Sequence, residues 1–363
     1  MPVRTWGGGS QVIGNLQVLR AVAAIGVVFF HTAYSLPSGV HTDFLGVATF
    51  FVISGFIMCF ITSHEADGFL TNRLIRIVPL YWLCIVALIL GTNPPISLDP
   101  HWLLAWARGT TEDPKLLGSL LFVPMKTPPV LGVGWTLNLE IYFYVVFAGA
   151  LWLSRRFAPL IAGAVILAVL VTTSIVPDLT FPPYYSHSYI GFFLGGTYIG
   201  FFLGGIAVFY LWRAAAGRLP RIPTAIASGA VIVFAYAVPV GIPPDGNWAY
   251  ALPLMIVGAA LLMASAGADI TWRPLILLGD SSYALYLTHT ILFEEFRRFN
   301  IVAYPMSGTM PMVMAVLASI GVGIAVHLWI EKPLNRMVKR LIVRLQAPAR
   351  SPGTTAAADL SGD

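Results

Sequence analysis

Long apolar runs separated by short polar segments dominate the whole chain. Ten of these runs hold about 20 residues each, which is the length that an α-helix needs to cross the hydrocarbon core of a bilayer. The ten runs occupy approximately residues 15–34, 44–63, 73–91, 135–153, 158–176, 189–212, 222–242, 249–267, 281–300 and 309–331. The pattern predicts an all-α integral membrane protein with about ten transmembrane helices in one bundle.

Lysine and arginine are distributed unevenly between the connecting segments, and this asymmetry predicts the orientation. If the N-terminus lies in the cytoplasm, fifteen of the 21 basic residues fall in inside segments, five fall in outside loops, and Arg20 lies within the first helix. The positive-inside rule then places both termini in the cytoplasm. We therefore expect a multi-pass protein of the bacterial inner (plasma) membrane.

The composition agrees with this class of protein. The chain is 57% hydrophobic and only 10% charged, whereas soluble domains carry roughly 25% charged residues. Such a chain has too few charges to cover a water-facing surface. No basic helix is interleaved with aromatic residues, which argues against a nucleic-acid partner. Cys59 and Cys84 lie inside apolar runs, so we expect two core residues rather than a disulfide or a zinc site.

Three segments depart from the regular succession of helices. The longest loop, 92–134, faces outside in the predicted topology, where it either holds an acceptor at the membrane interface or only connects two helices. The sequence YIGFFLGG at 189–196 is repeated at 198–205, a local duplication whose glycines allow close helix packing. We expect residues 1–344 to form the transmembrane domain and residues 345–363 a disordered cytoplasmic tail.

Arg20 and His31 are the first pair of ionisable residues at membrane depth, where such groups are costly and mark functional sites. Eleven residues at about 100° each bring the two side chains to within about 20° of one direction, roughly 16 Å apart along the axis. One helix face thus offers a cation near the cytoplasmic end and a base near the outer end. An extended pantetheine arm has a comparable length. The alternative is an arginine that snorkels to the interface and a histidine bonded to a neighbouring helix.

Arg73 and Arg76 stand at positions i and i+3 of the third predicted helix, on one face near its cytoplasmic end. Two guanidinium groups there either bind phosphate oxygens as a fork or serve as positive-inside anchors. Glu140 lies about five residues into the fourth predicted helix, at a depth similar to that of His31. A carboxylate there either orients the imidazole, orients the acceptor, or is a protonated structural group.

His289 lies in the apolar segment SSYALYLTHTIL (281–292). It either lines the same cavity or is a structural histidine with satisfied hydrogen bonds. The chain contains no HExxH, G-x-S-x-G or Walker A motif. His31, Glu140 and His289 come from distant helices and have no metal-ligand spacing, so we expect no metal.

Several motifs together resemble the acyltransferase-3 family of integral membrane O-acyltransferases, over nearly the whole chain. In order, they are Arg20-x10-His31, GVATFFVISGF at 46–56, Arg73-x-x-Arg76 with PLYW at 79–82, GWTLNLE at 134–140, SYALYLTH at 282–289 and IEKP at 330–333. Within the family the chain is most similar to the ExoZ-type acetyltransferases of exopolysaccharide synthesis. It departs from that group at Leu139, where an aromatic residue usually precedes the acid.

The resemblance implies an acyl-coenzyme A donor, acetyl-CoA in the ExoZ-type group, bound from the cytoplasm, and a hydroxyl acceptor on an exopolysaccharide or its lipid-linked sugar precursor. It assigns an essential role to His31 and donor binding to Arg20, Arg73 and Arg76. We expect Glu140 to assist catalysis, and Trp135, Asn138 and His289 to contact substrate. Acylation of a small secreted metabolite, such as a macrolide sugar, and a proton-coupled transporter or flippase are the alternatives.

Overall fold

The computed structural model describes nine stretches of the chain. These are residues 5–6, 10–11, 13–33, 43–92, 115–124, 128–175, 197–241, 251–299 and 309–346. Apart from a short antiparallel pairing of β1 (Thr5–Trp6) with β2 (Ser10–Gln11), the secondary structure in these stretches is helical. The predicted all-α class is confirmed for this part of the chain.

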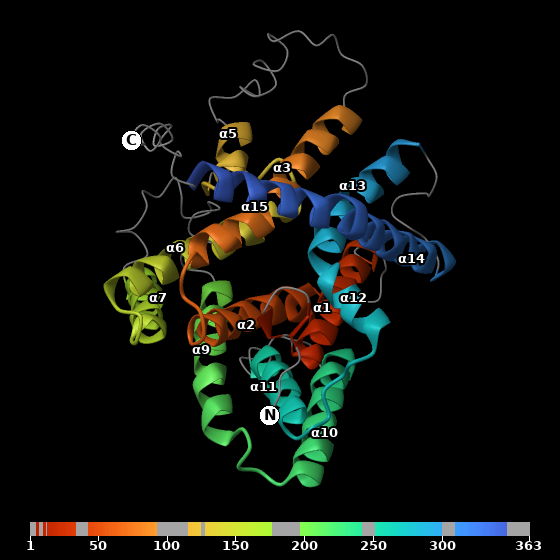
Figure 1. The fold of residues 1–363 in the computed structure, drawn as a ribbon. Coiled ribbons are helices and arrows are strands. Elements are labelled where there is room, and N and C mark those ends of the chain that lie inside the picture. Colours follow the sequence, from red (N-terminus) through yellow and green to blue (C-terminus); the bar gives the residue numbers. More distant parts are fainter. Residues whose placement is uncertain are drawn as a thin grey trace, which may run out of the picture.

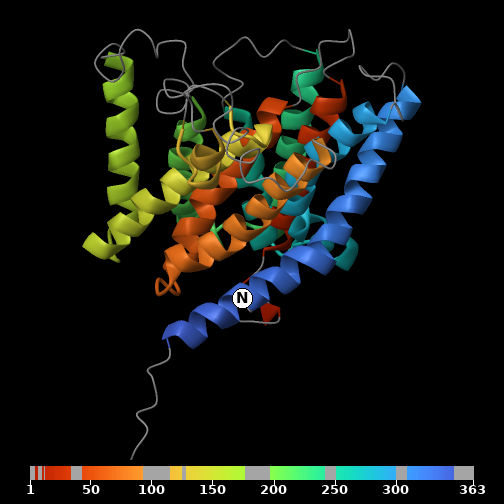
Figure 2. The ribbon, with the colours of Figure 1, turned by 90° about the horizontal axis from the view of Figure 1, so that it is seen from above.

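The helices form one bundle, with α7 at one side and α14 at the other (Figures 1 and 2). In chain order the helical elements are α1 (Gly14–Ala33), α2 (Asp43–Thr62), α3 (Phe69–Thr92), α5 (Lys115–Leu120), η1 (Gly132–Gly134), α6 (Trp135–Leu153), α7 (Ala158–Ile175), α9 (Thr197–Ala215), α10 (Arg221–Gly241), α11 (Leu252–Ser265), α12 (Arg273–Asp280), α13 (Ser282–Arg298), α14 (Thr309–Val326), the π-helical turn η4 (His327–Glu331) and α15 (Lys332–Gln346).

Helices occur at all ten positions where apolar runs predicted them. Within the described stretches, six segments are long and apolar enough to cross a membrane: Gly14–Thr32, Leu45–Thr62, Phe69–Gly91, Gly132–Leu153, Tyr198–Ala215 and Met310–Leu345. Three further apolar helices are shorter. The chain is therefore a membrane protein, while the count of ten crossings and the location of the termini stay predictions.

The predicted last helix, 309–331, is longer in the structure than the hydrophobic pattern indicated. It passes through η4 and continues as α15 to Gln346. The buried side chains of His327 and Glu331 form a hydrogen bond within η4, with 2.7 Å between Nδ1 and Oε2. Residues 347–363 of the predicted tail, the first YIGFFLGG copy and loop residues 93–114 lie outside the described residues.

Helices α2 and α9 pack closely in the core of the bundle. Gly55 and Gly205 face each other across this contact, and a Cβ atom added to Gly205 would lie 2.8 Å from the Cα atom of Gly55. Beside them, the rings of Phe51 and Phe202 lie 4.7 Å apart, and Phe202 stacks on Phe143 at 4.2 Å. Small residues let the two backbones approach, as is typical of helix contacts in membranes.

The N-terminus of α1 is capped from a distant part of the chain. The Asp269 carboxylate accepts hydrogen bonds from the backbone N–H groups of Gly14 and Asn15, at 3.2 and 2.9 Å. The Asn15 amide in turn bonds to the backbone of the segment after α11, where the Ile270 N–H donates to its Oδ1 atom at 2.9 Å. Side chains from a distant segment therefore satisfy backbone N–H groups at the start of the helix that carries Arg20 and His31.

Candidate active site

A pocket with about 740 Å³ of space between atoms, including its open mouth, lies where α1, α2, α3, α6 and α13 meet. Its polar lining comes from every one of these helices, and its apolar lining comes mainly from α2. The lining residues are Arg20, Val47, Phe50, Phe51, Ile53, Ser54, Ile57, Met58, Arg73, Arg76, Ile77, Thr136, Leu137, Glu140, Tyr144, Ser282, Tyr283 and Tyr286. The structure thus brings together all three predicted arginines and Glu140; we call this pocket the arginine cavity.

The three guanidinium groups of the arginine cavity share it with one carboxylate, that of Glu140, which interacts electrostatically with Arg20 and Arg73. Arg20 is 7% exposed and Arg73 is 9% exposed. Arg20 donates to Gln17 Oε1 at 3.2 Å, and Arg73 lies over the Phe69 ring at 5.9 Å. No carboxylate of the described residues forms an ion pair with Arg20, Arg73 or Arg76. Buried cations without a paired anion are costly, so the cavity is suited to an anionic ligand.

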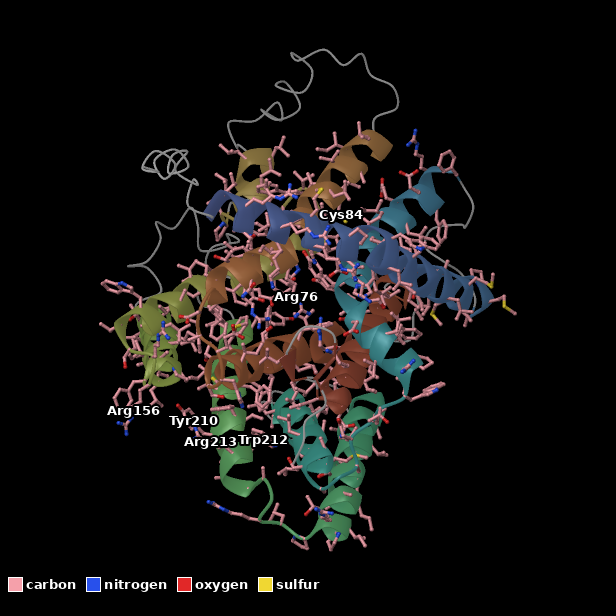
Figure 3. All side chains as sticks on the ribbon, viewed as in Figure 1. Arg76, Cys84, Arg156, Tyr210, Trp212 and Arg213 are labelled. Atoms are coloured by element: carbon pink, nitrogen blue, oxygen red, sulfur yellow. The ribbon has the colours of Figure 1, made fainter. Side chains whose placement is uncertain are left out.

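Arg76 occupies the interior between α2 and α3, as Figure 3 shows, whereas Arg156 and Arg213 stand at the outer edge of the molecule. Sequence position alone left two roles open for Arg73 and Arg76, and their placement bears on the choice between them. Arginines that only anchor a helix end can remain at the edge, in contact with water and lipid headgroups. Arg73 and Arg76 instead line the arginine cavity, three residues apart on one face of α3.

Glu140 is the acidic group of the arginine cavity. Its Oε1 atom accepts hydrogen bonds from the hydroxyl of Tyr144, one turn further along α6, and from Ser54 Oγ on α2 at 3.2 Å. Among the described residues, its side-chain hydrogen bonds thus go to α2 and α6 and not to His31. The structure therefore places the carboxylate with the arginines and not beside the imidazole, which was one of the arrangements expected from its depth.

His31 instead meets His289, which lies 258 positions later in the chain. Nδ1 of His31 and Nε2 of His289 are 3.3 Å apart, and the ring centroids are 5.0 Å apart. Each ring also reaches a backbone carbonyl one turn back in its own helix: Nδ1 of His31 lies 2.9 Å from Val27 O, and Nδ1 of His289 lies 3.2 Å from Leu285 O. We call these two residues the histidine pair.

The carbonyl contacts assign the tautomers of the histidine pair. A carbonyl oxygen only accepts hydrogen bonds, so Nδ1 of each ring carries a proton. Nε2 of neutral His289 is then an acceptor, and the one N–H of His31 Nδ1 is shared between this nitrogen and the closer Val27 carbonyl. In neutral His31 the proton on Nδ1 leaves Nε2 as the nitrogen with a basic lone pair, which is the form that a general base requires.

Tyr286 lies next to both the histidine pair and the arginine cavity. Tyr286 lines the cavity, and its ring lies 6.1 Å from His289 on one side and 6.3 Å from Phe50 on another. The Tyr286 hydroxyl donates to Val133 O at 3.1 Å and lies 2.9 Å from the Thr136 hydroxyl. The spacing on α1 suggested one site that holds both Arg20 and His31. Arg20 lines the cavity, whereas His31 is not among its lining residues.

Trp135 and Asn138 lie on α6 but outside the lining of the arginine cavity. The Trp135 ring packs against Tyr198 at 5.1 Å. Asn138 is buried, and neither atom of its side-chain amide has a hydrogen-bond partner among the described residues. The structure thus does not bring these two residues into the cavity with the arginines.

Sequence reasoning missed several polar residues of the site, among them Ser54, Tyr144 and Thr136. The available signal was a polar side chain inside an apolar run, as for Ser54 within GVATFFVISGF, or a spacing of one helical turn, as from Glu140 to Tyr144. For a metal, no group of three or more His, Cys, Asp and Glu side chains occurs in the part of the chain that the structure describes.

Comparison with known proteins identifies the class to which this site belongs. Residues 13–330 match the model of the acyltransferase-3 family, described as an acyltransferase domain. Because the match covers most of the chain, the protein belongs to this family and is a membrane-embedded O-acyltransferase. This confirms the resemblance drawn from the motifs and the enzyme class.

Individual relatives agree with this class. The exopolysaccharide production protein ExoZ of Rhizobium meliloti is 32% identical over 323 residues, covering 85% of this chain and 95% of the relative. Nodulation protein 10 of Rhizobium leguminosarum is 30% identical over 182 residues, 43% of this chain and 48% of the relative. YrhL of Bacillus subtilis, whose name provisionally assigns it to peptidoglycan O-acetylation, is 24% identical over 315 residues, 77% of this chain and 48% of the relative. No solved structure matches the chain.

Proposed function

We propose that this protein transfers an acetyl group from acetyl-coenzyme A to a hydroxyl of an exopolysaccharide or of its lipid-linked sugar precursor. The observation that carries the proposal is the arginine cavity, in which three guanidinium groups meet without an ion-pair partner among the described residues and beside a tyrosine that also lies next to a histidine. A donor with several phosphates and a long neutral arm matches a cationic site next to a base.

Arg20, Arg73 and Arg76 bind the phosphates of the donor in this proposal. Guanidinium groups form bidentate, charge-assisted hydrogen bonds with phosphate oxygens, and these bonds strengthen where water is excluded. Glu140 complements them, because it holds Tyr144 in the cavity lining and still leaves a net positive charge there. Glu140 therefore assists catalysis at the donor-binding arginines. The residue that orients His31 is His289.

His31 acts as the general base through Nε2. It removes the proton from the acceptor hydroxyl while the hydroxyl oxygen attacks the thioester carbonyl carbon. The carbon–sulfur bond then breaks, and the proton passes from the imidazolium to the departing thiolate, so that free coenzyme A and an acetyl ester result. A route through a transient acetyl-imidazole at the same nitrogen gives the same products in two steps.

ExoZ, whose name links it to exopolysaccharide production, supports a polysaccharide acceptor for this chain. The donor approaches from the cytoplasm, because the arginines lie at the predicted cytoplasmic ends of α1 and α3. The protein is accordingly a multi-pass protein of the bacterial inner membrane with both termini inside. A small secreted metabolite as acceptor would use the same donor site and the same base.

The proposal is tested with inside-out membrane vesicles that contain the native glycolipids and labelled acetyl-coenzyme A. Label is followed into base-labile ester, and wild type is compared with His31→Ala. General-base assistance contributes about 10²–10⁴-fold to rate, so we expect ester from wild type and at least a 100-fold lower rate from the variant. The level of each protein in the membrane is measured in parallel.

Full activity of a folded His31→Ala variant would refute the assigned base. Transbilayer movement of a sugar without ester formation by wild type would refute acetyl transfer and favour a transporter or flippase.

A further inference from the structure

Helix α15 carries a strong positive charge on one side. Five of its residues are basic and none is acidic: Lys332, Arg336, Lys339, Arg340 and Arg344. At about 100° per residue they fall within an arc of about 140° around the helix axis. Arg336, Arg340 and Arg344 follow one another at i, i+4 and i+8 and form a continuous row, which we call the arginine row.

A second row on α15 is apolar and exposed. Met337, Leu341 and Leu345 also follow one another at i, i+4 and i+8, and they are 60%, 55% and 77% exposed. This apolar row lies directly beside the arginine row, because Met337 and Leu341 stand three positions before Arg340 and Arg344. A groove along the helix is lined from both rows, by Arg336, Arg340 and Arg344 and by Met337 and Leu341.

The remaining side of α15 faces the protein. Leu334, Val338 and Ile342 are partly buried there, and α15 packs against α3 and η4. The helix therefore has three sectors: one on the protein, one apolar and exposed, and one exposed sector that is cationic apart from Pro333 and Val343. This separation is typical of helices that lie in a membrane interface.

The position of α15 along the chain agrees with such a location. The 23 residues from Thr309 to Glu331 span about 34 Å as a helix, slightly more than the ~30 Å hydrocarbon core. α15 thus starts where the crossing ends. Figure 2 shows that α15 leaves the direction of α14 at η4 and runs across the end of the bundle. π-helical turns commonly mark such changes in helix geometry.

We propose that α15 lies in the plane of the membrane interface, with Met337, Leu341 and Leu345 among the acyl chains and the arginine row on the phosphates of anionic lipids. Adjacent rows of arginine and apolar residues match the two layers of a leaflet, a phosphate layer next to hydrocarbon. A soluble anion would satisfy the arginines but would leave the apolar row in water.

The first test measures the depth of α15 with spin labels in vesicles of the full-length protein. Labels are attached to Arg340→Cys and Leu341→Cys, while native Cys59 and Cys84 are buried and serve as the unlabelled background. We expect the label at 341 to be more accessible to dissolved oxygen and the label at 340 to a water-soluble nickel complex. Equal access of the nickel complex to both sites, or low access of both reagents to 341, would overturn the proposal in favour of water or a protein partner.

The second test concerns the lipid headgroup. Phosphatidylglycerol or phosphatidylcholine is added to purified protein, and the shift in Tm is recorded. Three proteins are compared: wild type, the α15 triple Arg336→Gln/Arg340→Gln/Arg344→Gln, and a matched triple. The matched triple, Arg213→Gln/Arg218→Gln/Arg221→Gln, changes three arginines at the α9–α10 connection. We expect a larger shift with phosphatidylglycerol for wild type and for the matched triple, and loss of that difference in the α15 triple. An unchanged response of the α15 triple, or an equal loss in the matched triple, would contradict specific headgroup binding by α15.

Discussion

His31 presents Nε2 as its basic nitrogen because both partners of Nδ1 are acceptors. One is the Val27 carbonyl at 2.9 Å and the other is Nε2 of His289 at 3.3 Å. The second contact reaches across from α13 and also fixes the plane of the ring. His289 is fully buried and is itself held by the Leu285 carbonyl. In the proposed mechanism, His289 is therefore a positioning residue that acts through His31.

We predict that His289→Leu lowers kcat for acetyl transfer by about 10- to 100-fold, because one buried hydrogen bond of about 1–3 kcal/mol is lost at the base. The KM for the donor stays within twofold, since His289 does not line the arginine cavity. His289→Gln recovers part of the rate, because an amide oxygen can accept from Nδ1 of His31. Steady-state kinetics of the three proteins check this.

A purely structural His289 would give another result. Both variants would then lose rate together with thermal stability, and glutamine would restore neither.

The sequence predicted the residue types of the site better than their pairing. Spacing placed Arg20 and His31 on one face of α1, and the structure has Arg20 in the cavity. The partner of His31 was not predictable, because helical periodicity fixes directions within one helix and contains no distances between helices. The similar depth of Glu140 and His31 in the membrane suggested that the Glu140 carboxylate could orient the imidazole. In the structure the hydrogen bonds of Glu140 go to Tyr144 and Ser54.

At the scale of elements, the contact between α2 and α9 holds one wall of the arginine cavity in place. α2 contributes Phe50, Phe51 and Ser54 to that wall, and Gly55 behind them packs on Gly205. Gly205 closes the second copy of the YIGFFLGG duplication. Gly204 and Gly205 of this copy lie in close contacts, as expected from the sequence, whereas Gly200 does not.

We predict that Gly205→Ala lowers the free energy of unfolding by about 1–3 kcal/mol, because its Cβ atom would lie 2.8 Å from Gly55 Cα and 2.9 Å from Phe56 N. Gly258→Ala on α11 is the control, since no atom lies within 4 Å of the added Cβ. The control gains the helix propensity of alanine without a clash. Thermal unfolding in detergent compares the two, and equal Tm values would contradict the close contact.

Hydrophobic periodicity located the helices well because crossing segments must be long and apolar. Most predicted limits agree with the structure to within a few residues, as for 135–153 and α6 (Trp135–Leu153). α15 was missed because its charges ended the apolar run at residue 331. Its alternating rows of arginine and apolar residues are the signal of an interfacial helix rather than of a crossing.

For the whole molecule, the proposed function assigns donor binding and proton transfer to two different parts of the structure. The arginine cavity gathers cations from α1 and α3, and the histidine pair joins α1 to α13 next to Tyr286. Because α1 carries residues of both, its capped start at Asp269 fixes the two parts relative to each other. A substitution in the histidine pair should then leave donor binding intact, and a substitution in the arginine cavity should leave proton transfer intact.

The most direct test of this division is equilibrium binding of acetyl-coenzyme A to the purified protein, measured with transfer activity on the same preparations. Wild type is compared with Arg76→Gln, His31→Ala and the control Arg156→Gln, which changes an arginine at the outer edge of the molecule. Loss of one charge-assisted contact of about 1.5–3 kcal/mol weakens binding by about 10- to 100-fold. Among these variants, we predict that only Arg76→Gln binds acetyl-coenzyme A about 10- to 100-fold more weakly. We predict that His31→Ala binds the donor within twofold of wild type but does not transfer the acetyl group. Donor binding by Arg76→Gln equal to wild type, or loss of binding in His31→Ala, would contradict the division.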